Sequence, residues 1–130
     1  MKGERVRFEV VAAFAIGVLL PVLETVRRGF GHWAIDATTM LEDYLAGALL
    51  ILGGLAATRR AAFAHALLLT AWASVSGMMT ISLISQLEDT IRAVDLEPHN
   101  GAVVGFKLLL WMVCLSALIR SFRAVTRRPA

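Results

Sequence analysis

Four long apolar stretches divide the 130-residue chain, and each is close to the length of a membrane-spanning helix. They lie near residues 8–26, 38–58, 61–88 and 102–122. An α-helix crosses the hydrocarbon layer of a bilayer, which is ~30 Å thick, in about 20 residues. Hydrophobic residues form 58% of the chain, well above the share in soluble domains. We therefore predict one all-α membrane domain over residues 1–130, an antiparallel bundle of four transmembrane helices.

The basic residues give this predicted bundle an orientation, because cytoplasmic connections of membrane proteins are enriched in Lys and Arg. Nine of the thirteen bases fall at one end: Lys2, Arg5, Arg7, Arg59, Arg60, Arg120, Arg123, Arg127 and Arg128. We predict that both termini are cytoplasmic, in the plasma (inner) membrane. The net charge of +3 then reflects anchors that attract anionic lipid headgroups, and nucleic acid is not a predicted partner.

The acidic residues gather at the opposite, outer end. Acids contribute little to membrane orientation, so this bias needs another explanation. Eight of the ten acids lie there: Glu24, Asp36, Glu42, Asp43, Glu88, Asp89, Asp95 and Glu97. In the first stretch, Pro21 cannot donate to the Gly17 carbonyl, which predicts a kink one turn before Glu24. A freed carbonyl beside a carboxylate could bind a cation or a proton. An ordinary membrane proline followed by an interfacial glutamate explains the same pattern.

The second stretch places two carboxylates at membrane depth. Its apolar run, residues 44–57, is about 21 Å long and too short to cross alone, so Glu42 and Asp43 fall inside the span. Small residues follow these acids at helical spacing: Ala46, Gly53 and Ala57 after Glu42, and Gly47 and Gly54 after Asp43. We predict that this helix contacts two neighbours and that both acids face protein. Alternatively, Thr39 and Glu42 form a capping box that starts the helix.

Lys107 is the one base placed well inside an apolar stretch, about 7.5 Å after Ala102 along the helix axis. Its ammonium either snorkels to the outer surface or pairs with a carboxylate. The candidate charged cluster therefore consists of Glu24, Glu42, Asp43 and Lys107. It is predicted either to bind an ion or solute or to hold the helices together. The residues do not identify a catalytic group.

Secondary candidates lie in the outer connections. Glu88 and Asp89 lie at the end of the third stretch, whose first 26 residues, 61–86, would form a helix of ~39 Å that must be tilted or protrude from the bilayer. His32 and His99 could join carboxylates around a divalent metal. The chain lacks the ExxH and HExxH spacings that typify helical metal sites, and no facing histidine pair suggests haem. We predict no bound cofactor.

Three classes of function remain open. The favoured one is an accessory, assembly or interaction protein that contacts the lipid bilayer and either a membrane partner protein or a second copy of itself. The alternative is a small transporter or channel subunit that uses the charged cluster for protons, cations or a cationic solute. The least favoured is a membrane enzyme with a site of carboxylates and histidine, since the chain has no phosphate-binding loop or nucleophile elbow.

Overall fold

The computed structural model describes residues 8–92 and 100–127, and nearly all of them are helical. The elements are α1 (Phe8–Arg28), the short 3₁₀ helix η1 (Phe30–Ala34), α2 (Ala37–Thr58), α3 (Ala64–Arg92) and α4 (Asn100–Thr126). Each of the four α-helices is long and apolar enough to cross a membrane. The prediction of an all-helical chain with four such helices is therefore confirmed, and this architecture is compatible with a small integral membrane protein.

The helix ends are set by backbone geometry. Gly29 adopts a φ of 79° and stops α1, which is continuous through Pro21. Arg60, with a φ of 54°, stops α2 in the same left-handed conformation. The N–H of Ala61 then donates to the carbonyl of Ala56, and that of Arg60 donates to Ala57. This pairing is a Schellman motif, so α3 begins at Ala64 rather than at residue 61.

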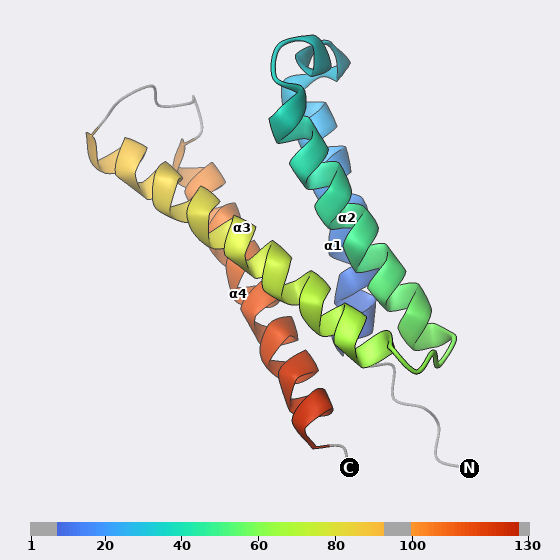
Figure 1. The fold of residues 1–130 in the computed structure, drawn as a ribbon. Coiled ribbons are helices and arrows are strands. Elements are labelled where there is room, and N and C mark those ends of the chain that lie inside the picture. The colour runs from blue at the N-terminus through green and yellow to red at the C-terminus, as the bar shows by residue number, and fades with distance from the viewer. Residues whose placement is uncertain (1–7, 93–99, 128–130) are drawn as a thin grey trace.

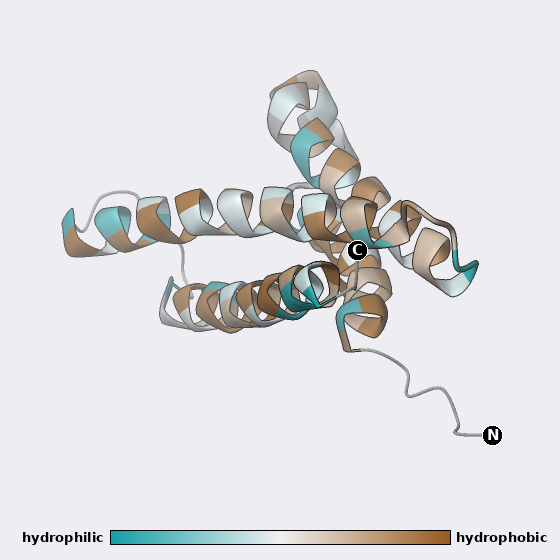
Figure 2. Ribbon diagram, turned by 60° about the horizontal axis from the view of Figure 1, so that its bottom comes forward, coloured by the Kyte–Doolittle hydropathy of each residue, from teal (hydrophilic) through white to brown (hydrophobic). Residues whose placement is uncertain are grey.

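The helices pack as two pairs, α1 with α2 and α3 with α4, and α2 also packs on α3. Figure 1 shows the pairs close together where α1 begins and α4 ends, and diverging toward the opposite end. We call the first the basic end, because it carries Arg59, Arg60, Arg120, Arg123 and Arg127. We call the second the acidic end, because it carries Glu24, Asp36, Glu42, Asp43, Glu88 and Asp89. Hydrophilic residues lie mostly toward the helix ends, with apolar stretches between them (Figure 2).

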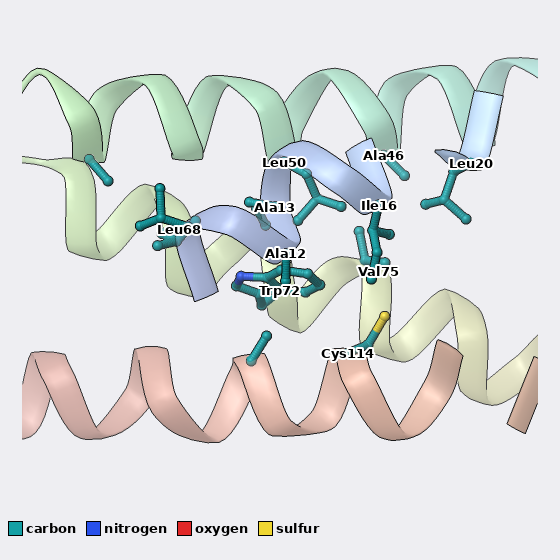
Figure 3. Close-up of a cluster of buried hydrophobic side chains, with 14 of the residues drawn as sticks. Ala12, Ala13, Ile16, Leu20, Ala46, Leu50, Leu68, Trp72, Val75 and Cys114 are labelled. Carbon is teal, nitrogen blue, oxygen red and sulfur yellow. The ribbon is translucent and has the colours of Figure 1, made fainter. Parts of the chain in front are cut away.

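One apolar core joins all four helices and extends from the basic end past the middle of the bundle, to Leu20 of α1 and Leu110 of α4. Trp72 of α3 is fully buried in it. Figure 3 shows Ala12 and Ala13 of α1, Leu50 of α2 and Leu68 of α3 around the indole ring. The small alanines let the helix backbones approach the large ring, which fills the space at their junction. The core therefore depends on one bulky side chain placed among small ones.

Glycines bring α2 into close contact with two neighbours. A β-carbon at Gly47 would collide with the carbonyl oxygen of Gly17 and lie 3.0 Å from Cδ of Pro21, both in α1. One at Gly53 would lie 3.1 Å from Leu68 of α3. The small-residue pattern of this helix thus predicts its two contacts correctly. The Gly17 carbonyl, which Pro21 leaves without its usual intrahelical donor, lies against the Gly47 backbone.

Candidate functional site

The α1–α2 pair holds three of the four residues of the candidate charged cluster. Glu24 is buried with 7% of its surface exposed, Asp43 is half-buried and Glu42 is exposed. Glu24 and Asp43 both take part in polar or electrostatic contacts. Burying a carboxylate is costly unless neighbouring groups stabilise it, so Glu24 is the residue of the three with the strongest requirement for a specific environment.

An aromatic and hydroxyl contact closes this pair at the acidic end. The hydroxyl groups of Thr25 in α1 and Tyr44 in α2 are hydrogen bonded at 2.5 Å. The Tyr44 ring also meets Trp33 of η1 edge to face, with ring centroids 5.3 Å apart. The 3₁₀ helix therefore packs on the end of the pair, next to the Thr25–Tyr44 contact, and Thr25 directly follows Glu24.

The fourth residue of the cluster, Lys107, belongs to the other pair and contacts a neutral amide. Its Nζ donates to Oε1 of Gln86 in α3 at 3.1 Å. Nε2 of Gln86 donates to Oδ1 of Asn100 at 2.7 Å, and Nδ2 of Asn100 donates to Oγ1 of Thr90 at 2.8 Å. We call Gln86, Thr90, Asn100 and Lys107 the amide network. It joins the end of α3 to the start of α4.

A second polar contact joins the same two helices one turn nearer the middle of the bundle. Nε1 of Trp111 in α4 donates to Oγ1 of Thr80 in α3 at 2.8 Å. The Thr80 hydroxyl in turn donates to the carbonyl of Ser76 at 2.8 Å. Lys107 and Trp111 are four residues apart and so share one face of α4. Both residues therefore make polar contacts with α3 from the same face.

The candidate cluster is thus divided between the two helix pairs, which diverge at this end (Figure 1). Sequence reasoning left two alternatives for Lys107, the outer surface or a carboxylate, and it did not consider Gln86 or Asn100. The polar residues that end the third apolar stretch and precede the fourth could have indicated contacts of Gln86 and Asn100. Neutral amides at such boundaries are easily interpreted as solvated helix ends, because an uncharged side chain does not require a partner of opposite charge.

The secondary candidates, Glu88, Asp89, His32 and His99, are not members of the amide network. Glu88 forms an ion pair with Arg92 at 2.8 Å on the exposed surface of α3, and Asp89 is also exposed. His32 lies in η1, and its side chain is not described; His99 lies outside the described residues. Within residues 8–92 and 100–127, no three His, Cys, Asp or Glu side chains are grouped closely enough to hold a metal ion.

One further ionisable residue lies at the basic end, where sequence reasoning did not place a candidate. Glu9 is only 5% exposed, and its backbone carbonyl accepts a hydrogen bond from Nε1 of Trp72 at 3.2 Å. The preceding residue, Phe8, lies under the guanidinium group of Arg120, 5.3 Å from the ring centroid. These contacts tie the start of α1 to α3 and α4. Glu9 was missed because it lies in the first turn of the predicted helix, where an acid is ordinarily explained by the helix dipole.

Comparison with known proteins adds no relative to this picture. No protein-family model, curated protein or solved structure matches the chain. Functional inference therefore rests on the residues and contacts described above.

Proposed function

We propose that this protein is a small accessory or assembly protein of the plasma membrane, whose polar residues fix helix packing while α4 presents a surface to a membrane partner. In this proposal the helices are antiparallel transmembrane segments, the basic end and both termini are cytoplasmic, and α1 bends at Pro21. The contact between Lys107 and Gln86 carries the proposal. It uses the most deeply placed base of α4 to join two helices.

The other polar contacts at the acidic end support the same role. Thr25 with Tyr44, and Trp111 with Thr80, each connect the two helices of one pair. Hydrogen bonds between membrane helices typically stabilise a bundle by about 0.6 kcal/mol, with a maximum near 1.7. These contacts hold the helices of each pair together, as expected if the polar residues have a packing role.

The exposed surface of α4 supports the proposal of a membrane partner. Only 17% of the apolar 18-residue segment of α4 is buried, against 39–44% of the corresponding segments of the other three helices. Gly101 and Gly105 lie on exposed surface, and a β-carbon at either would meet no atom within 4 Å. Two glycines four residues apart let a helix of another chain approach closely. The proposed partner is a helix of a membrane protein, with a second copy of this chain as the alternative.

Native gel migration of the protein, expressed at its natural level and mildly solubilised, tests this proposal. We expect a complex larger than the monomer that is lost in Gly105→Leu and kept in Gly77→Leu, a matched change at an exposed α3 glycine. Mass spectrometry of the complex distinguishes a foreign partner from a second copy. Circular dichroism shows whether each variant folds. A wild-type protein that migrates only as a monomer would contradict the accessory function.

A transporter remains the second candidate, because α1 buries a carboxylate near each of its ends. Glu9 and Glu24 are 5% and 7% exposed, and they are separated by roughly 22 Å along the helix. Buried ionisable residues in membrane helices commonly mark ion pathways. Proton flux into proteoliposomes that is lost in Glu24→Gln, but kept in the exposed control Glu42→Gln, would favour transport. The accessory function predicts no flux above that of empty liposomes.

A further inference from the structure

The end of α3 extends further than the helices of the neighbouring pair. With 29 residues, α3 is about 43 Å long, whereas α1, with 21 residues, is about 31 Å long. The hydrocarbon layer is ~30 Å thick, so α1 matches it while α3 exceeds it. A helix that is too long tilts or reaches into the headgroup region. The last turns of α3 therefore lie where acyl chains meet lipid headgroups.

These turns carry an exposed apolar ridge. Ile84, Leu87 and Ile91 are 58%, 41% and 84% exposed, and their spacing places them on one face of α3. Together with Glu88 and Arg92 they line a shallow and widely open depression on the surface of this one helix. Aliphatic side chains this exposed require an apolar cover, and at this depth a lipid acyl chain supplies one.

The depression is bordered by one charge of each sign. The ion pair between Glu88 and Arg92 leaves 52% and 69% of these side chains exposed, so both charged groups stay accessible beside the ridge. A guanidinium group binds phosphate through a fork of N–H donors. A carboxylate accepts hydrogen bonds from a primary ammonium group. A lipid headgroup with a phosphate and a primary ammonium is complementary to both.

We propose that this depression, formed by Ile84, Leu87, Glu88, Ile91 and Arg92, is a binding site for a zwitterionic phospholipid with a primary ammonium headgroup. Its phosphate lies on Arg92, its ammonium on Glu88 and one acyl chain along the ridge. The site belongs to α3 and is separate from the proposed partner surface of α4. It requires only that α3 spans a bilayer, so it does not depend on the accessory function.

Lipid-specific fluorescence quenching tests the site. A bimane label is attached to Leu87→Cys in a Cys114→Ala background and reconstituted in vesicles that contain ethanolamine, choline or glycerol phospholipids, one of which has brominated chains. The matched control is Leu109→Cys, an exposed position of α4 outside the site. We expect the label at 87 to be quenched by brominated ethanolamine lipid with an apparent affinity roughly fivefold above that for the choline lipid. Quenching at 109 should follow the mole fraction of each lipid.

Two substitutions connect the selectivity to the charges. Arg92→Gln and Glu88→Gln should each make the label at 87 behave like the label at 109. Arg127→Gln, which removes an exposed arginine at the other end of the bundle, should leave the selectivity unchanged. Equal quenching at 87 by all three brominated lipids would overturn the site. A preference for the glycerol lipid that is lost in Arg92→Gln would overturn the proposed headgroup in favour of an anionic one. Neither result bears on the α4 partner complex.

Discussion

Near the basic end the four helices bury Trp72, Leu50 and Ala13 in one apolar core, whereas near the acidic end each pair is joined by its own polar contacts. The two halves therefore use different means of cohesion. Apolar burial contributes less between helices surrounded by lipid than it does in water, so close packing must stabilise the core. Where the pairs diverge, hydrogen bonds within each pair add to the packing of its two helices.

The largest expected effect lies in the core. Trp72→Ala removes a fully buried ring that contacts several helices and should lower the free energy of unfolding by about 3 kcal/mol or more. Reversible unfolding in mixed detergent micelles measures this change. Val18→Ala, at a position that is 55% exposed, should have little effect. If Trp111→Ala at the acidic end costs as much as Trp72→Ala, the contrast between the halves is wrong.

The next effect concerns the contact between α1 and α2. Gly47→Ala places a methyl group against the Gly17 carbonyl, so it should destabilise the protein by about 2 kcal/mol through overpacking. Gly77→Ala makes the same chemical change where no atom lies within 4 Å and should stay within about 0.5 kcal/mol of the wild type. The same unfolding measurement compares them. Equal behaviour of the two variants would show that the pair is not closely packed at Gly47.

A smaller effect is expected in the amide network. Double-mutant analysis of Lys107→Met with Gln86→Leu should give a coupling energy of about 1 kcal/mol in unfolding experiments. The comparison cycle pairs Lys107→Met with Glu42→Gln and should give no coupling, since these residues belong to diverging pairs. Coupling in the second cycle but not in the first would restore the charged cluster that the sequence predicts.

The smallest effect belongs to the exposed ion pair of α3. Glu88→Gln should change the free energy of unfolding by about 0.3 kcal/mol, because both side chains are more than half exposed. Salt at ~1 M should remove even this difference by screening the charges. Unfolding curves of the wild type and Glu88→Gln at low and high salt measure it. A loss above about 1 kcal/mol would place this pair among the structural contacts.

The existence of the helices and the two contacts of α2 were predictable from the sequence. Long apolar runs require helices in a membrane, and glycines at helical spacing indicate close neighbours. Helix ends were less predictable. Arg60 stops α2 in a left-handed conformation that glycine usually adopts, so the start of α3 at Ala64 had no local signal.

The partners of individual polar residues were the least predictable part. The sequence shows that Lys107 needs a polar neighbour, but which one it meets depends on how α3 and α4 slide and rotate against each other. Periodicity fixes the face of each helix and leaves that relative register open. The buried state of Glu9 has the same origin, since it arises from the packing of α1 against Trp72.

The pairing of polar groups between consecutive helices also has a consequence for biogenesis. Thr25 meets Tyr44, and Gln86 meets Asn100 and Lys107, so each contact joins segments made one after the other. If the helices are transmembrane segments, as proposed, the first pair can enter the lipid with its Thr25–Tyr44 contact already made once α2 has been synthesised. The second pair can do the same on completion of α4. Only the Trp72 core must wait for both, which makes assembly of that core the natural last step.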